Sequence, residues 1–520
     1  MFLLVAAGAY GSTVNCNNNS GDSALIRSAL KSAGSGGTVT ITGTCALGSA
    51  TLVPAGPVII NGSALLNYSG GGDIVSYSGN SLVVNGLTFQ GGGIHGTSSH
   101  YQGAWSITNC KFQNISTTNS SYGAILIDHI LAGSPYTPGP NNISNNTFTN
   151  IWQNGYPWNT GSGSEGIAGS GIWFQGGLDQ TIVDSNTFVK IGYNAIKGFF
   201  DNQYGTSPGW ALTSHNIVIS NNVMTNVHRI GIEFQGIGGG NCPGGCNYSQ
   251  NPNDGLVMKG NFFHAPSVPV NNQFAYSALF GGTNSQYINN VGVVEVTACG
   301  FRPGIALESG LNGGTVQGNV FGSVVTTCNP SGWATYITDS YAHSGVTNTY
   351  QDNVLCGTGE PAPLDKNATG ATVVDRYNYK AATCPNTPNL ATSNISALAF
   401  TSANNQSFPS GGSGTWNLAV VSTLSLRYVQ FFIAGSTTPI ATQEIQDTNT
   451  NFSSDRKWLY HATFNTSGLS GGSHTITAKA TDVSGATQSI TQTFSAGFVG
   501  TPAAQVNPTP LGHRAVVAGS

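Results

Sequence analysis

Short segments in which apolar and polar residues alternate recur along the first three quarters of the chain. In one recurring motif an Asn lies two residues before a large apolar residue, as in Asn146–Phe148 and Asn186–Phe188. The equivalent positions follow one another at intervals of a few tens of residues and are Leu87, Cys110, Asn146, Asn186, Asn222, Asn261, Asn290, Asn319 and Asn353. Because helix-forming segments are missing between them, this repeat predicts the stacked coils of a parallel β-helix.

The same alignment predicts what lies inside the coils. Asn amides that stack from one coil to the next can hydrogen-bond along the axis of a β-helix. The large apolar residues that follow them are expected to stack in the core, and they are Phe112, Phe148, Phe188, Met224, Phe263, Phe321 and Leu355.

A second short strand follows the Asn motif in each coil. The predicted strands are Ala124–Asp128, Gly171–Gln175, Ala195–Phe199, Gly231–Gln235, Ser277–Gly281, Gly304–Glu308 and Trp333–Ile337. Their period-2 alternation places one set of residues inward, namely Ile125, Ile127, Ile172, Phe174, Ile232 and Phe234. The outward set is then Leu126 and Asp128, Trp173 and Gln175, Lys197 and Phe199, Glu233 and Gln235, Leu279 and Gly281, Ala306 and Glu308, and Thr335 and Ile337.

Composition narrows the fold class and the partners. Lys and Arg number 16 and Asp and Glu 20 among 520 residues, so 7% of the chain is charged, against roughly 25% in an ordinary domain. A mostly helical fold is excluded, because long amphipathic helices need those charged residues. The net charge is −4 and no basic run occurs, so we expect no nucleic-acid partner. No apolar stretch of about 20 residues occurs, so we expect no membrane span.

The coil order, the Asn row and the apolar stack resemble the right-handed parallel β-helix proteins of the pectate-lyase-like superfamily. The segment Gly21–Leu30, followed by Gly36–Ile41, is similar to the capping helix and first strand of those proteins. The resemblance covers about residues 11–385. It implies an all-β chain with a right-handed parallel β-helix of about nine or more coils. It also implies a substrate groove over one sheet, walled by variable loops. The superfamily hosts lyases, hydrolases and non-enzymes, so the activity stays open.

The remaining parts of the chain have other patterns. Residues 1–10 read as a signal-peptide remnant, residues 386–393 as a linker, and residues 498–520 as a flexible tail. Residues 394–497 predict an antiparallel sandwich of seven strands: Ser396–Thr401, Thr415–Ser422, Leu426–Ala434, Ile440–Asp447, Lys457–Asn465, His474–Asp482 and Thr487–Phe494. This region resembles bacterial Ig-like modules, which implies a spacer, our preferred interpretation, or a carbohydrate-binding appendage.

The chain has nine cysteines, and its composition favours an oxidising compartment. Cys299 and Cys328 follow successive Asn positions at the same offset. They are therefore expected in adjacent coils about 4.8 Å apart, a separation that suits a disulfide. The other predicted pairs are Cys242–Cys246, Cys16–Cys45 and Cys356–Cys384. Cys110, which occupies a place in the Asn row, is left as a buried, inert thiol.

The longest loops flank the second set of strands, so we place the substrate groove over that sheet. Charged residues are rare, yet several gather on these strands or at their ends. The candidate catalytic residues are Lys197, Glu233, Asp128, Asp201, Arg229 and His129. The candidate substrate-binding residues are Trp173, Gln175, Phe199, Gln235, Glu308, Tyr156 and Trp158. The aromatic members of this set could stack on sugar rings.

Two chemistries fit these residues. A polysaccharide lyase needs a base and positive charge or Ca²⁺; Lys197, Arg229 or His129 could supply the base, with Asp128 and Glu233 as possible Ca²⁺ ligands. The segment Ile127–His129 resembles part of the Trp-Ile-Asp-His segment of pectate lyases. A hydrolase needs two carboxylates about 5 Å apart for retention or about 6.5–9.5 Å for inversion. Glu233 with Asp201 or Asp128 are the candidate pairs.

We therefore expect a secreted or cell-surface, bacterial-like, monomeric protein that binds and cleaves an extracellular polysaccharide. The alternative is a non-catalytic surface, adhesive or glycan-binding β-helix. On that alternative Lys197 and Glu233 form an ordinary cross-coil ion pair, worth about 0–1 kcal/mol if exposed. An enzyme predicts that the charged side chains converge within reach of one sugar ring. A structural protein predicts that they are scattered or fully paired.

Overall fold

The computed structural model divides into two compact units, Met1–Thr387 and Pro388–Ser520. The residues that it describes are 11–77, 79, 81–96, 104–117, 123–128, 140–154, 169–175, 178–199, 214–235, 253–265, 275–279, 282–294, 305–307, 311–323, 337–339, 345–356, 364–365, 372–381, 394–422, 424–433, 435–447 and 457–497. Among these residues no helix is long and apolar enough to cross a membrane.

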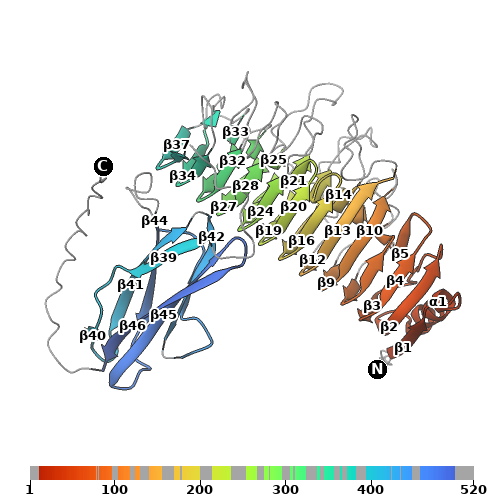
Figure 1. The fold of residues 1–520 in the computed structure, drawn as a ribbon, viewed down its shortest axis with the longest axis horizontal. Coiled ribbons are helices and arrows are strands. Elements are labelled where there is room, and N and C mark those ends of the chain that lie inside the picture. The colour runs from red at the N-terminus through yellow and green to blue at the C-terminus, as the bar shows by residue number, and fades with distance from the viewer. Residues whose placement is uncertain are drawn as a thin grey trace, which may run out of the picture. The chain divides into compact units, whose positions relative to one another are not determined.

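The first unit is a parallel β-helix, as predicted, in which three rows of parallel strands stack coil upon coil (Figure 1). The first row is β1 Gly11–Asn17, β2 Gly37–Gly48, β3 Val58–Gly62, β6 Leu82–Asn85, β9 Ser106–Thr108, β12 Asn141–Ser144, β15 Thr181–Asp184, β19 Val218–Ser220, β23 Val257–Lys259, β27 Gln286–Ile288, β31 Thr315–Gln317, β34 Thr347–Gln351 and β37 Thr372–Arg376. The second row is β4 Leu65–Tyr68, β7 Thr88–Gln90, β10 Lys111–Thr117, β13 Thr147–Gln153, β16 Thr187–Ile191, β20 Val223–Val227, β24 Phe262–Ala265, β28 Val291–Val294, β32 Val320–Ser323, β35 Val354–Cys356 and β38 Tyr379–Ala381.

The third row is a ten-stranded sheet, called sheet B below, and it carries the candidate site. Its strands are β5 Asp73–Tyr77, β8 Gly93–Gly96, β11 Gly123–Asp128, β14 Ser170–Gln175, β17 Ile196–Phe199, β21 Ile230–Gln235, β25 Ala275–Leu279, β29 Ile305–Leu307, β33 Ile337–Asp339 and β36 Leu364–Asp365. Four very short strands make a further sheet: β18 Ser214–His215, β22 Asn253–Asp254, β26 Gly282–Thr283 and β30 Leu311–Asn312.

The predicted Asn row forms a continuous buried ladder. The backbone N–H and the Nδ2 of Asn146 both donate to Oδ1 of Asn186 at 3.0 Å, and the same Nδ2 donates to the carbonyl of Ile107. The same arrangement joins the members that follow, which are Asn186, Asn222, Asn261, Asn290, Asn319, Asn353 and Asn378. Buried amides normally need partners, and here each coil supplies them for the coil before it.

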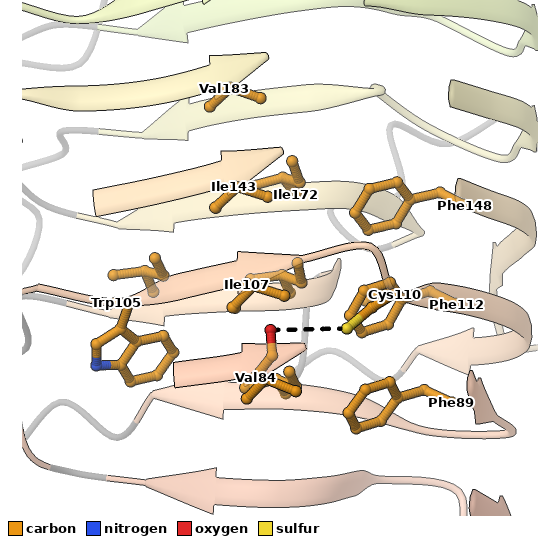
Figure 2. Packing of buried hydrophobic residues seen from close by; sticks show 14 of the residues in the cluster. Val84, Phe89, Trp105, Ile107, Cys110, Phe112, Ile143, Phe148, Ile172 and Val183 are labelled. Carbon is orange, nitrogen blue, oxygen red and sulfur yellow. Dashed lines mark hydrogen bonds between the residues drawn. The ribbon is translucent and has the colours of Figure 1, made fainter. Parts of the chain in front are cut away.

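The predicted apolar stack is also present. Phe89, Phe112, Phe148 and Phe188 lie in register on successive strands, with ring centroids 4.7–4.9 Å apart and nearly parallel planes. Figure 2 shows three of these rings one above another beside the aliphatic residues of the neighbouring rows. The row continues through Met224 and Phe263, and Gly292 interrupts it before Phe321.

The N-terminal end is capped as the sequence predicts. Helix α1, Asp22–Ala33, buries its apolar face against the first strands. The fully buried Asp22 accepts hydrogen bonds from the backbone N–H groups of Asn17, Asn19 and Ala46. The predicted Cys16–Cys45 disulfide is confirmed. Cys110 is confirmed as a free, buried thiol. Of the other predicted disulfide cysteines, Cys356 lies in β35, while Cys242, Cys246, Cys299, Cys328 and Cys384 lie outside the described residues.

The inward face of sheet B matches the prediction in its first coils. Ile125, Ile127, Ile172, Phe174, Ile232 and Phe234 are all fully buried in the main core. Further along, the predicted outward position is right on β29, where Ala306 pairs with Ala278, and wrong by one residue on β25 and β33. Leu279 pairs with Phe234 and Ile337 with Ile305, both in the inward register, whereas Ala278 and Thr338 occupy the outward register.

The second unit is a β-sandwich. Its three-stranded sheet holds β39 Ile395–Phe400, β41 Ser413–Ser422 and β44 Lys457–Asn465. Its five-stranded sheet holds β40 Gln406–Phe408, β46 Thr487–Ala496, β45 Gly472–Asp482, β42 Leu426–Ile433 and β43 Ala441–Gln443. Trp416 and Phe464 of the first sheet pack against Phe494 and Phe408 of the second. The sequence predicts seven of these strands and misses β40.

Candidate functional site

The outward face of sheet B brings together one row of residues from successive coils. Leu126 on β11, Trp173 on β14, Lys197 on β17 and Glu233 on β21 are in register, each opposite the next. Parallel strands lie about 4.8 Å apart, so these four residues form a continuous line along the β-helix. Leu126 and Trp173 form a small apolar cluster with Tyr193, separate from the main core.

Lys197 and Glu233 form a buried ion pair. The Nζ of Lys197 lies 2.7 Å from Oε2 of Glu233, and the two side chains are 2% and 1% exposed. Nδ2 of Asn194 donates to the same oxygen, and Nη1 of Arg229 lies 3.5 Å from it. Oδ1 of Asn194 in turn accepts from the backbone N–H of Ile230. One carboxylate oxygen is therefore held by three donors, Lys197 and Asn194 from the preceding coil and Arg229 from its own.

The partners of Glu233 fix its charge. Burial raises the pKa of this carboxyl, but the positive charges of Lys197 and Arg229 and the hydrogen bonds from Lys197 and Asn194 lower it by more. The net pKa is below the ordinary Glu value, so the group is an anion at neutral pH. An ionised carboxylate accepts hydrogen bonds and has no proton to donate.

Two aromatic rings face the cations of this cluster. The ring centroids of Trp173 and Tyr193 are 6.4 Å apart and their planes differ by 21°. Nζ of Lys197 lies 5.7 Å from the centre of the Trp173 ring, and the guanidinium carbon of Arg229 lies 4.7 Å from that of Tyr193. Arg229 also donates to the Tyr193 hydroxyl. Each cation is therefore held between an aromatic face and the Glu233 carboxylate.

A second polar pair, which was not predicted from the sequence, lies on the same face. His95 on β8 is in register with Leu126, so it continues the outward row by one coil. Its Nδ1 lies 2.7 Å from Oδ2 of Asp73 on β5. The side chains of His95 and Asp73 are 17% and 18% exposed. The sequence signal for this pair was that Gly93–Gly96 lies one coil before Ala124–Asp128, the first strand predicted for this row.

The structure places part of the predicted site. It brings Lys197, Glu233, Arg229 and Trp173 together. The next outward position along these strands is occupied by Asp128, Gln175, Phe199 and Gln235 on successive coils, and the Gln175 side chain is buried. Tyr193 and Asn194 belong to the cluster and were not predicted. His129, Tyr156, Trp158, Asp201 and Glu308 lie outside the described residues.

The register argues against a joint role for Asp128 and Glu233. Strands β14 and β17 lie between β11 and β21, so the two residues stand three strand spacings apart, about 14 Å. Two ligands of one Ca²⁺ each lie about 2.3–2.6 Å from the ion, and a hydrolase pair is at most about 9.5 Å apart. The suggestion that these two residues share an ion or form a hydrolase pair is therefore wrong for this backbone.

Comparisons with known proteins assign no family to this chain. A scan against protein-family models gave no match, and neither did a search of curated proteins. Among solved structures, the chain is similar to a tailspike protein mutant of the E. coli bacteriophage HK620, at 12% identity over 88% of this chain and 80% of that one, with a TM-score of 0.33. It is similar to a GH136 lacto-N-biosidase from Eubacterium ramulus, at 11% identity over 64% of this chain and 63% of that one, with a TM-score of 0.33. It is also similar to a PL6 alginate lyase in complex with a trisaccharide, at 12% identity over 72% of this chain and 86% of that one, with a TM-score of 0.36.

The stacked parallel strands define the first unit as a parallel β-helix. That fold alone assigns no activity, since one fold hosts many functions. The residues of sheet B carry the features that bear on function.

Proposed function

We propose that this chain is a secreted protein that binds and cleaves an extracellular polysaccharide along the outward face of sheet B. The observation that carries the proposal is the cluster of Trp173, Tyr193, Lys197, Arg229 and Glu233 on adjacent coils. Apolar rings with a few convergent polar groups are typical of small-molecule sites. A carboxyl with a shifted pKa beside specific charged partners marks a functional candidate.

In this proposal the members of the cluster have different roles. Arg229, which is 14% exposed, donates to sugar oxygens, and the buried rings of Trp173 and Tyr193 hold Lys197 and Arg229 in place. Glu233 stays ionised and accepts from hydroxyl groups or from Lys197. Asp128, Asp201, His129, Tyr156, Trp158, Gln175, Phe199, Gln235 and Glu308 remain candidate groove residues. The second unit is proposed to be an Ig-like spacer, and the protein a monomer.

One observation favours the non-catalytic alternative. Lys197 and Glu233 are 2% and 1% exposed and satisfy each other, as a purely structural pair would. On this second candidate function the β-helix binds a glycan without cleaving it, and the cluster only holds β14, β17 and β21 in place.

The test is an activity screen of the full chain against neutral and acidic polysaccharides, with and without Ca²⁺. Two products are read: the ultraviolet absorbance of an unsaturated sugar, which elimination forms, and new reducing ends. Both signals together identify a lyase, and reducing ends alone identify a hydrolase. Binding without either signal would replace the enzyme by the second candidate.

Matched variants connect the result to the cluster. Glu233→Gln removes the charge and keeps the size of the side chain, so it is expected to weaken binding and cleavage. Glu444→Gln makes the same change at an exposed position of the second unit and is expected to leave both unchanged. Equal activity of the two variants would remove Glu233 from the site.

A further inference from the structure

An amine and a side-chain amide meet at one carboxylate oxygen inside the cluster on sheet B. Nζ of Lys197 lies 2.7 Å from Oε2 of Glu233, and Nδ2 of Asn194 donates to the same oxygen. All three side chains are buried. Because each nitrogen is within hydrogen-bonding distance of one oxygen, the amine and the amide nitrogen lie at most about 6 Å apart.

The Asn194 amide is held at both of its ends. Asn194 lies in the bend between β16 and β17, whereas Lys197 is on β17 itself. Oδ1 of Asn194 accepts from the backbone N–H of Ile230, which belongs to the next coil, at 3.3 Å. A backbone N–H in this position stabilises negative charge that develops on the amide oxygen. The amide carbon is therefore prepared for attack by a nucleophile.

Glu233 can release the nucleophile. Its carboxyl is ionised, because the nearby positive charges and hydrogen bonds hold its pKa below the ordinary value, and a carboxylate can accept a proton from the Lys197 ammonium group. The neutral amine that remains is a nucleophile, whereas the ammonium is not. Burial disfavours the charged forms of both groups. The transfer of a proton within this pair therefore costs less than it would in water.

We propose that Lys197 and Asn194 become joined by an isopeptide bond, with Glu233 as the catalytic residue. Oε2 takes a proton from Nζ, and the neutral amine forms a bond to Cγ of Asn194. The N–H of Ile230 stabilises the negative oxygen of the tetrahedral intermediate. Oε2 passes its proton to Nδ2, the Cγ–Nδ2 bond breaks, and ammonia leaves. The second proton of Nζ goes through Oε2 to the ammonia, so the products are the new amide, ammonium and the unchanged carboxylate.

The position of the two groups makes this reaction possible without another molecule. Reacting groups held in one place gain the large advantage of an intramolecular reaction. Burial also keeps water, the competing nucleophile, away from the Asn194 amide. When Lys197 loses its charge, Arg229 remains beside the carboxylate, with Nη1 3.5 Å from Oε2. The linked form therefore leaves no buried carboxylate without a cation.

The inference goes beyond the proposed polysaccharide function and does not depend on it. An amide nitrogen is neither a base nor a cation at neutral pH. In the linked protein Lys197 is therefore removed from the candidate bases, and Arg229 is the cation that stays beside Glu233.

Digestion of the full-length chain with trypsin tests the bond. Lys197 is the only lysine or arginine between Lys190 and Arg229, and trypsin does not cut after a lysine whose amine is in an amide. The folded chain is therefore expected to yield one peptide, 191–229, lighter than its sequence by one ammonia, in place of 191–197 and 198–229. Fragmentation of that peptide is expected to place the loss between Asn194 and Lys197.

Two variants remove the chemistry in different ways. Lys197→Arg keeps a cation opposite Glu233 but has no amine, so trypsin is expected to cut after residue 197 and no ammonia is lost. Glu233→Gln cannot take the proton, and linkage is expected to slow by about a hundredfold or more, the usual range for a general base. Glu444→Gln makes the same change at an exposed position of the second unit and is expected to remain linked. Circular dichroism checks that each variant is folded.

The unaltered chain decides the matter whether or not a variant folds. Complete cleavage after Lys197, with peptides of the sequence mass, would overturn the inference. Loss of ammonia together with cleavage after Lys197 would also overturn it, because that combination marks a cyclised Asn instead of a link to lysine. Equally fast linkage in Glu233→Gln would exclude Glu233 as the catalytic residue. None of these results changes the outcome of the polysaccharide screen, so the two proposals fail separately.

Discussion

Lys197 and Glu233 stand opposite each other on β17 and β21, with Nζ and Oε2 2.7 Å apart in an almost fully buried environment. Taking two such charges out of water costs several kcal/mol per ion, and only good geometry with further hydrogen bonds offsets that cost. Here Asn194 and Arg229 supply the further donors. The pair therefore makes the outward face of sheet B sensitive to any change that leaves one charge alone.

Removal of one partner is expected to destabilise the β-helix strongly. Lys197→Met leaves Glu233 as a buried carboxylate without its closest cation, at an expected cost of about 3–5 kcal/mol. The double variant Lys197→Met with Glu233→Met removes both charges and is expected to recover part of that loss. The midpoints of thermal and urea unfolding measure both effects. A double variant less stable than Lys197→Met would contradict this account of the pair.

The pKa of Glu233 predicts how stability depends on pH. Its folded-state pKa lies below the ordinary value of 4.5, because Lys197, Arg229 and Asn194 together outweigh the effect of burial. The stabilisation is therefore fully present above that ordinary value and is lost as pH falls through the lower folded-state value. Thermal midpoints of the unaltered chain and Glu233→Gln should differ most at neutral pH and converge in acid. A constant difference down to strongly acidic pH would show that the charge of Glu233 is not the source.

The Asn ladder predicts a large effect of a single amide. Asn186→Ala removes two donated bonds, to Ile143 and Asn222, and the acceptor for two N–H groups of Asn146. Each buried group left without a partner costs about 1–3 kcal/mol, so a loss of several kcal/mol is expected. Asn67→Ala, at an exposed position on β4, is the control and should change stability by no more than about 0.5 kcal/mol. Similar unfolding midpoints for the two variants would refute the structural role of the ladder.

Much of the β-helix could be predicted because its core repeats in sequence. The Asn position and the large apolar residue two places later mark the same point in each coil, and they marked the members from Asn146 to Asn353. Asn378 was missed because Lys380 stands where the large apolar residue is expected, in register with Leu355. The strand Ala275–Leu279 was placed on the wrong face because apolar residues occur at both alternate positions, Ala278 and Leu279.

The site was less predictable because it depends on contacts between coils. Lys197 and Glu233 could be paired from their equivalent strand positions. Asn194 and Tyr193 lie just before β17, and only the stacking of the coils shows that they meet Glu233 and Arg229. His95 was missed because the outward row was not extended to β8, and its partner Asp73 comes from one coil earlier still.

The reactivity of the Cys110 thiol tests the N-terminal end of the Asn ladder, where Asn146 is the first member. Its backbone N–H donates to Oδ1 of Asn146, and its Sγ lies 3.2 Å from the carbonyl oxygen of Thr108 and 3.8 Å from that of Val84, the contact drawn in Figure 2. Burial raises the pKa of the thiol to about 11, and only the thiolate reacts readily. Iodoacetamide is therefore expected to leave Cys110 unlabelled in the folded chain and to label it in urea, as read by mass spectrometry of the peptide.

Asn146→Ala removes the acceptor that holds the Cys110 backbone and should speed labelling under native conditions, whereas Asn67→Ala should not. Rapid labelling of the unaltered, folded chain would contradict the buried position of this thiol.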